Sequence, residues 1–157
     1  MDKLKRCYIK PLTSRWEVAQ IIAQLRQEDL DELVASGYED ASAAIDGIWE
    51  FALGQEQALA LEGVFLPSGE PLAIGGCGVA CGVGIPWILC TVRSSAHPVA
   101  LWEAVRFKAP LWDAAYPRQM NRAWVPNTRH IALIRKLGYK FSPEVCPRGF
   151  ITFSKGI

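Results

Sequence analysis

Acidic side chains gather in one early segment, and they are the first candidates for acid–base chemistry. Glu28, Asp29, Asp31 and Glu32 fall within five residues, and Glu50 follows further along the chain. A carboxylate held beside an amine can accept its proton. A solvated acidic helix face explains the same pattern, because exposed helix surfaces commonly carry charge. The spacing does not single out one of these residues as a base.

Two other patterns suggest binding chemistry, but their spacing argues against it. Cys77 and Cys81 have three residues between them and no second pair, and the only histidines are His97 and His130, so we expect no metal site. The glycine-rich segment 75–84 lacks the Gly-Lys-Ser/Thr of a P-loop and misses the dinucleotide spacing. Closely packed strands and a tight hairpin explain these glycines better.

The composition indicates one globular domain over residues 1–157 and excludes several classes of function. The net charge is +1, so we expect no nucleic-acid partner. No apolar run reaches the roughly 18 to 20 residues of a membrane span, and the N-terminus lacks the apolar core of a secretion signal. Five cysteines at irregular spacing predict free thiols, and therefore a cytoplasmic protein. Basic residues of the second half solvate the surface or attract an anionic ligand: Arg118, Arg122, Arg129, Arg135, Lys136 and Lys140.

The hydrophobic periodicity predicts a mixed α/β fold. Ser14 and Glu17 have the spacing of a helix capping box. Helices are expected at 14–37, at 40–54, from Pro98, and from Asn127 or Thr128 to Leu137. Strands are expected at 6–10, 57–66, 72–80, 87–92, 120–125, 139–141 and 149–153. Pro110 should kink or break its helix, and the order of elements describes a mixed sheet with helices on both faces.

The segment from Asn127 to Tyr139 resembles the end of a GCN5-related N-acetyltransferase (GNAT). In that family an Asn opens the fourth helix, a Leu follows six positions later, and Lys-Leu-Gly-Phe ends it. Asn127, Leu133 and the ending Lys136-Leu-Gly-Tyr match this spacing, with Tyr139 in place of Phe. Together with the order of elements, the resemblance implies a GNAT-like, mostly antiparallel sheet. It also implies transfer of an acetyl group from acetyl-CoA to a small amine or a protein amine.

The resemblance also places acetyl-CoA in a cleft where two strands diverge, here residues 87–92 and 120–125. Unpaired backbone groups of the first strand would bind the pantetheine arm by adding to the ladder of the sheet. The candidates for cofactor contacts at this cleft are Leu89, Cys90, Thr91, Val92 and Asn127.

The loop after this strand departs from the family. GNAT proteins carry Gln/Arg-x-x-Gly-x-Gly/Ala there, and its glycines let backbone N–H groups approach the pyrophosphate. Residues 91–98 contain no glycine. Arg93, Ser94 and Ser95 before a helix N-terminus could still hold an anion. Alternatively, Ser95 or His97 only caps the helix.

The catalytic acid is also altered. Many members of the family place a Tyr one position after the matching Leu, where this chain has Ile134. Tyr139 is the remaining candidate for the acid, although it occupies the position where the family packs a Phe. Cys90 is a second polar group on the strand, or a small thiol of the core. We expect His130 on the exposed side of its helix.

A narrower resemblance points to a different role. The hairpin, the Trp87-Ile-Leu-Cys-Thr strand, the helix start at Pro98 and the Arg-Lys-Leu-Gly-Tyr ending look like a bacteriophage branch of the fold. That branch includes the internal virion protein of T7-like podophages. It implies a non-catalytic virion or structural protein with phage partners, in the virion or the host cytoplasm. An enzyme that uses acetyl-CoA and a structural protein therefore both remain open.

Overall fold

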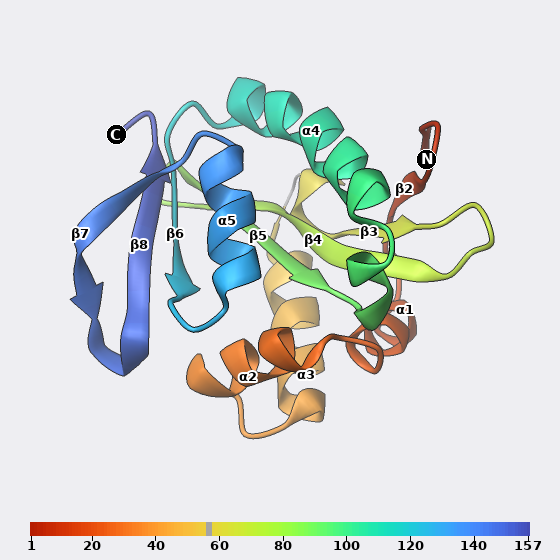
Figure 1. Ribbon diagram of the computed structural model, residues 1–157, viewed down its shortest axis with the longest axis horizontal. Helices are drawn as coiled ribbons and strands as arrows, with labels where there is room; N and C mark the ends of the chain where they lie inside the picture. The colour runs from red at the N-terminus through yellow and green to blue at the C-terminus, as the bar shows by residue number, and fades with distance from the viewer. Residues whose placement is uncertain (56–57) are drawn as a thin grey trace.

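The computed structural model describes residues 1–55 and 58–157, and its centre is one sheet of eight strands (Figure 1). The strands lie in the order β1-β2-β3-β4-β5-β6-β8-β7. Neighbours pair antiparallel, except that β5 and β6 pair parallel. Their bounds are β1 Asp2–Lys3, β2 Tyr8–Pro11, β3 Glu62–Phe65, β4 Pro71–Ala80, β5 Val83–Cys90, β6 Gln119–Trp124, β7 Lys140–Cys146 and β8 Phe150–Lys155.

Helices cover both faces of this sheet. α4 and α5 lie on one face, α1 and α3 lie on the other, and α2 lies near the ends of β5 and β6 (Figure 1). Their bounds are α1 Arg15–Ile22, α2 Gln27–Ala35, α3 Ala41–Leu53, α4 Pro98–Ala115 and α5 Thr128–Lys136. The predicted mixed, mostly antiparallel sheet with helices on both faces is confirmed. Among the described residues, no helix has both the length and the apolar character needed to cross a membrane.

The start of α1 is the predicted capping box. The N–H of Glu17 donates to Ser14 Oγ at 3.2 Å, and the Glu17 carboxylate accepts from the Thr13 N–H at 2.9 Å. Lys10 Nζ lies 3.1 Å from the same carboxylate. These contacts, above all the Thr13 hydrogen bond, lower the pKa of Glu17 to about 2. The carboxylate therefore ties the start of α1 to β2.

The predicted single helix over residues 14–37 is wrong, because the chain leaves the helix after Ile22. Residues 24–26 run antiparallel to the end of β5. One N–H of this segment donates to the Cys90 carbonyl, and one of its carbonyls accepts from the Val92 N–H, each at 3.0 Å. Backbone bonds to the sheet thus replace helical bonds, and the region forms two helices, α1 and α2.

Other predicted boundaries also shift. The helix that starts at Pro98 is confirmed, but it continues past Pro110, so a break there is wrong; Pro110 is exposed. The strand predicted at 57–66 is shorter, since a 3₁₀ turn at Ala58–Ala60 precedes β3, and residue 57 lies outside the described residues. The strand predicted at 139–141 continues to Cys146 as β7.

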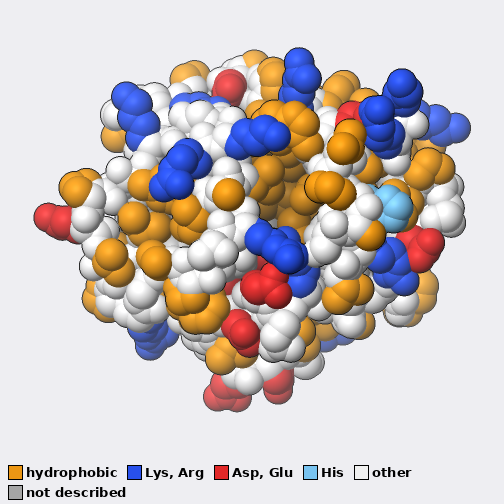
Figure 2. Space-filling model, in the orientation of Figure 1, with side chains coloured by type: hydrophobic (Ala, Val, Ile, Leu, Met, Phe, Trp, Pro, Cys, Tyr) orange, Lys and Arg blue, Asp and Glu red, His pale blue; other side chains and the backbone are white. Residues whose placement is uncertain are grey.

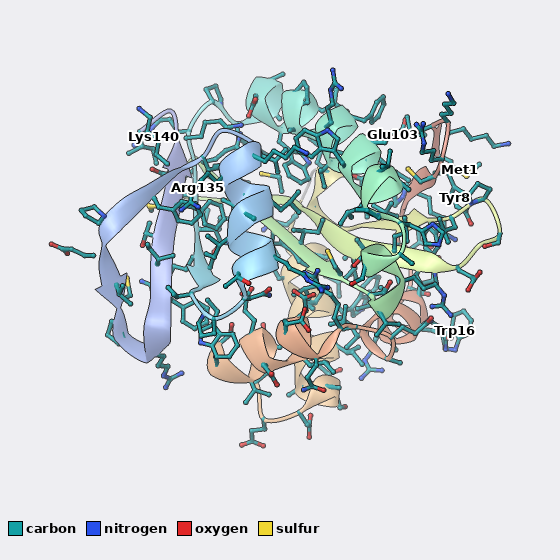
Figure 3. The ribbon with its side chains drawn as sticks, viewed as in Figure 1. Met1, Tyr8, Trp16, Glu103, Arg135 and Lys140 are labelled. Carbon is teal, nitrogen blue, oxygen red and sulfur yellow. The ribbon has the colours of Figure 1, made fainter. Side chains whose placement is uncertain are left out.

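Neighbouring residues of β5 enter two different cores, because strand side chains alternate between faces. Leu89 packs among buried side chains of α1 and α3, whereas Cys90 packs against those of α4. A third cluster joins Ile134 of α5 to Phe153 of β8. Trp16 instead projects from α1 into solvent, with 69 % of its surface exposed (Figure 3). β5 thus contributes side chains to both helical layers.

The glycine-rich segment 75–84 allows close backbone packing, as predicted. A Cβ on Gly76 would lie 2.4 Å from the Ala60 carbonyl oxygen, and one on Gly75 would lie 2.5 Å from that of Trp87. Real Cβ atoms essentially never come this close to another heavy atom. The glycines therefore let β4 approach both β5 and the 3₁₀ turn.

We expect Gly76→Ala to lower the free energy of unfolding by about 1 to 3 kcal/mol, because the added methyl meets backbone and not a flexible side chain. Gly54→Ala is the control. Gly54 has an ordinary φ of −78°, and its Cβ would lie 3.5 Å from the nearest atom. Urea denaturation should show a change within about 0.5 kcal/mol for the control. Equal stabilities of the two variants would contradict this explanation.

Candidate functional site

β5 and β6 start side by side and then diverge, which leaves a gap in the sheet (Figure 1). Among the described residues their one registered pair joins Gly84 to Gln119. Further along the two strands, the Asn121 side-chain amide of β6 donates to the Pro86 carbonyl of β5 at 2.8 Å. Beyond that point Ile88 directs its N–H and C=O toward the gap, because backbone groups alternate between the two edges of a strand.

Two clefts open on opposite faces of this gap. The α4–α5 cleft has a volume of about 330 Å³, and Figure 2 shows a hollow on this face with hydrophobic walls and Lys or Arg side chains at its rim. The α3 cleft has a volume of about 290 Å³. The α4–α5 cleft is lined among others by Arg26, Cys90, Ser95, Trp102, Arg129 and Lys136. The α3 cleft is lined among others by Glu32, Tyr38, Trp87, Arg122, His130 and Phe150.

The strand residues predicted to bind pantetheine lie at the end of β5, but this chain already uses most of their backbone groups. The Cys90 carbonyl and the Val92 N–H bond to residues 24–26, and the Cys90 N–H donates to Asp29 at 3.3 Å. Thr91 directs its N–H to β4. Leu89 alternates with Cys90 and faces the other edge and the other core. The open position on this strand is therefore Ile88.

The loop between β5 and α4 is held by its own side chains. The Arg93 guanidinium forms an ion pair with Glu70 at 2.5 Å, and Arg93 is not among the residues that line the α4–α5 cleft. Ser94 is buried and donates to the carbonyl of the residue before this 3₁₀ turn. Ser95 lines the cleft, where its hydroxyl accepts from Arg129 Nη1 at 2.6 Å. Of these three predicted residues, Ser95 offers the most direct contact with an anion.

Asp29 is the centre of a buried polar network between the two clefts. Its side chain is 1 % exposed. It accepts hydrogen bonds from Arg26 Nε at 2.5 Å, from Asn127 Nδ2 at 2.9 Å and from the Cys90 N–H. An ionised carboxylate stays buried only with such partners. This carboxylate consequently joins the start of α2, the end of β5 and the start of α5.

Glu32, one turn further along α2, makes the second half of the network. Its Oε1 accepts from the Trp124 N–H at 3.1 Å, and its Oε2 lies 3.0 Å from His130 Nδ1. Both side chains line the α3 cleft. With Nδ1 held by the carboxylate, Nε2 is the nitrogen left to exchange a proton. A carboxylate that orients a histidine in this way is a common arrangement for general base catalysis.

The expected exposed position of His130 is wrong, and the solvated-face interpretation fails for Asp29 and Glu32. All three side chains are buried. Their sequence signal is a spacing of three residues from Arg26 through Asp29 to Glu32, repeated from Asn127 to His130. Residues three apart lie on one face of a helix. Sequence reasoning missed Arg26, because the spacing alone does not show that its partner Asp29 is buried.

Two basic residues of α5 face the α4–α5 cleft. Arg129 donates to Ser95 and lies 3.9 Å from Glu28. Lys136 places Nζ 4.1 Å from the centre of the Trp102 ring. Residues seven apart share a helix face, so both positive charges border one cleft. This geometry favours the anionic-ligand alternative for these two residues.

Tyr139, the predicted acid, lies in the core between α5 and β8. Its ring packs edge to face with Phe153 at 5.2 Å, and its hydroxyl donates to Gln119. Burial raises the pKa of Tyr139, and Tyr139 is absent from the linings of both clefts.

Cys90 was the second polar candidate on the strand. Burial raises the pKa of the Cys90 thiol to about 12, which keeps that thiol protonated.

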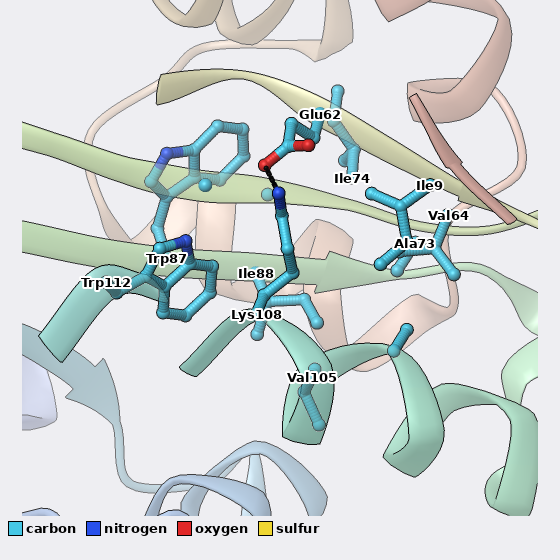
Figure 4. Close-up of a pocket in the computed structure, with 13 residues that line it drawn as sticks. Ile9, Glu62, Val64, Ala73, Ile74, Trp87, Ile88, Val105, Lys108 and Trp112 are labelled. Atoms are coloured by element: carbon cyan, nitrogen blue, oxygen red, sulfur yellow. Dashed lines mark ion pairs between the residues drawn. The ribbon is translucent and has the colours of Figure 1, made fainter. Parts of the chain in front are cut away.

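A separate small cavity lies between the sheet and α4 (Figure 4). There Lys108 Nζ lies 2.8 Å from the Glu62 carboxylate. Burial raises the pKa of Glu62, and the Lys108 charge offsets part of that rise. The cavity volume of about 30 Å³ suits about one water molecule and no substrate. Over residues 1–55 and 58–157, no three His, Cys, Asp or Glu side chains are grouped as metal ligands.

We expect Asp29→Asn to lower the free energy of unfolding by about 3 to 5 kcal/mol, because the buried Arg26 charge loses its buried partner and keeps only the more exposed Glu28, 3.8 Å away. Asp31→Asn is the control, since Asp31 lies on the exposed side of the same helix and should change stability by less than about 0.5 kcal/mol. Urea denaturation of both variants checks this. A loss at Asp29 no larger than at Asp31 would show that the network does not support the fold.

No family model matches the sequence, and no curated protein matches it. Solved structures do match over nearly the whole chain. A GNAT-family acetyltransferase from Bacillus anthracis has 13% sequence identity, a TM-score of 0.66, and coverage of 98% of this chain and 95% of that one. The ribosomal-protein-S18-alanine N-acetyltransferase of Escherichia coli has 12% identity, a TM-score of 0.63, and coverage of 95% and 92%.

The PaiA N-acetyltransferase of Thermoplasma acidophilum, solved in complex with coenzyme A, has 8% identity and a TM-score of 0.65, with coverage of 96% of this chain and 99% of that one. These neighbours are bacterial and archaeal proteins, and they lend no support to the bacteriophage branch. At such low identities the likeness concerns the fold alone. The protein has the fold of the GCN5-related N-acetyltransferases.

Proposed function

We propose that this protein is an acyltransferase that uses acetyl-CoA to acetylate an amine. One observation carries the proposal: two clefts open on opposite faces of the β5–β6 gap, one bordered by basic side chains and the other by the Glu32–His130 pair. A transfer reaction needs two substrates that meet from different sides, and this arrangement supplies two entrances to one gap. The fold shared with acetyltransferases supports the same conclusion.

The α4–α5 cleft fits the anionic end of acetyl-CoA. Ser95, Arg129 and Lys136 offer a hydroxyl and two cations there, and phosphate groups favour such donors. The pantetheine arm has fewer options, because residues 24–26 and Asp29 occupy the backbone groups of Cys90 and Val92. Ile88 would supply the backbone contact. Acetyl-CoA would bring a thioester as the acyl donor.

The α3 cleft would take the amine. His130 Nε2 accepts the proton that the amine loses when it attacks, and Glu32 stabilises the resulting imidazolium. The same imidazolium can then return a proton to the departing thiolate. His130 thereby takes both parts that were expected of a separate base and of Tyr139. The aromatic side chains of Tyr38, Trp87 and Phe150 line this cleft.

We expect wild-type protein to bind acetyl-CoA, and Arg129→Ala or Lys136→Ala to weaken binding by about tenfold each, because each variant loses a charged contact with phosphate. Arg135→Ala is the control, since Arg135 lies on the same helix but stacks 5.2 Å from the centre of the Phe141 ring. Isothermal titration calorimetry measures the affinities. Binding that Arg135→Ala weakens as much as Arg129→Ala does would place the phosphates elsewhere.

We expect His130→Gln to lower the rate of acetyl transfer by roughly 10²- to 10⁴-fold while acetyl-CoA still binds, because Gln fills similar space but accepts no proton. Thiol release from acetyl-CoA in the presence of primary amines measures the rate. Tyr139→Phe is the comparison, and its rate should stay within a few fold of wild type. A large loss in Tyr139→Phe alone would restore Tyr139 as the catalytic acid.

A second candidate is a binding or structural protein that keeps the fold without turnover, such as a component of a virion. The observation that favours it is the 24–26 segment, which already pairs with the strand edge that a cofactor would otherwise use. The calorimetric titration separates the two candidates. Absence of acetyl-CoA binding by folded wild-type protein would favour the structural role and end the enzyme proposal.

A further inference from the structure

Next to the α3 cleft lies a second cleft whose charged lining residues are arginines. This arginine cleft has a volume of about 400 Å³ and lies between the end of α2 and the turn before β8. It is lined by Ala35, Ser36, Asn121, Arg122, Pro147, Arg148 and Phe150. Ser36, Asn121, Arg122 and Phe150 also line the α3 cleft, so the two clefts adjoin each other.

Both guanidinium groups are free to bind a ligand. Among the described residues, neither the Arg122 nor the Arg148 guanidinium forms an ion pair or a hydrogen bond; the one side-chain partner of Arg122, Asn121 Oδ1, accepts from its backbone N–H. Arg6 and Arg15, by contrast, hold carboxylates of this chain within 3.0 Å. The residues that line the arginine cleft also include no carboxylate. Both charged residues of its lining are therefore positive.

The backbone holds Arg148 in this position. Its φ is +66°, in the left-handed region that residues with a side chain rarely adopt. A Cβ on Gly37 would lie 3.3 Å from Arg148 Nη1. Because Gly37 has no side chain, the guanidinium has room at the end of α2. Unfavourable backbone conformations that persist in a fold often mark binding sites.

We propose that the acceptor is a small amine that also carries an anionic group, a carboxylate or a phosphate. Arg122 and Arg148 bind the anionic group while the amine lies at His130. A guanidinium matches both groups because its donors form a planar fork. Clefts of about 290 and 400 Å³ have the size of small-molecule sites. This inference rests on the proposed acetyl transfer and names its acceptor class.

The test compares amines that differ in the anionic group alone. 5-Aminopentanoate is paired with pentylamine, and phosphoethanolamine is paired with ethanolamine, which separates a carboxylate from a phosphate. Thiol release from acetyl-CoA gives kcat/KM for each amine, and calorimetry gives its affinity without acetyl-CoA. The variants are Arg122→Ala and Arg148→Ala. Arg118→Ala is the control, because Arg118 is exposed before β6 and is absent from both cleft linings.

We expect at least one anionic amine to exceed its neutral partner in kcat/KM by about tenfold or more, and each cleft variant to remove about tenfold of that preference. Arg118→Ala should leave the preference unchanged. Equal turnover of neutral and anionic amines would overturn the inference and keep acetyl transfer. Arginine-dependent binding of an anionic amine without turnover would keep anion recognition and overturn acetyl transfer. Neither turnover nor binding of any of these amines would overturn both.

Discussion

The buried carboxylate of Asp29 is the interaction on which the arrangement of the clefts depends. It bonds to Arg26 of its own segment, to the backbone of β5 at Cys90, and to Asn127 at the start of α5. β5 and β6 share little direct pairing, so the ends of these strands need another connection. Asp29 and Glu32 provide it, because α2 reaches β5 through one carboxylate and β6 through the other.

The same bonds limit what can enter the gap. An acetyltransferase of this fold presents strand backbone to its cofactor, whereas this chain satisfies much of that backbone internally. Buried N–H and C=O groups need partners, so the 24–26 segment stabilises the strand end when no ligand is bound. A ligand must use the remaining backbone at Ile88 and the cations at Arg129 and Lys136. A shared fold does not by itself carry an activity. In this chain the 24–26 segment and a cofactor would compete for the same backbone groups of β5.

In the loop before α4, side chains likewise take a place that backbone has in the family. Glycines usually allow backbone to wrap a pyrophosphate, but here Arg93, Ser94 and Ser95 use their side chains to hold the loop. Arg93 pairs with Glu70, and Ser94 bonds to backbone. Ser95 alone meets a basic residue of α5, Arg129. The positive charge at this cleft therefore comes from α5 and not from the loop.

Local patterns were enough to predict most of the elements, the capping box at Ser14, the close-packed glycines, and the cap at Asn127, whose side chain accepts from the His130 N–H. The break between α1 and α2 was not predictable, since hydrophobic periodicity continues across it and only pairing with Thr91 interrupts the helix. The candidate site likewise has one part that the sequence shows and another that only the fold shows. The spacing of Arg26, Asp29 and Glu32 is legible in the sequence, but two of the partners of Asp29 lie 61 and 98 residues away. Only the assembled fold removes water from the Asp29 and Glu32 carboxylates and supplies their hydrogen-bond donors. Burial together with these donors turns an acidic helix face into a candidate site.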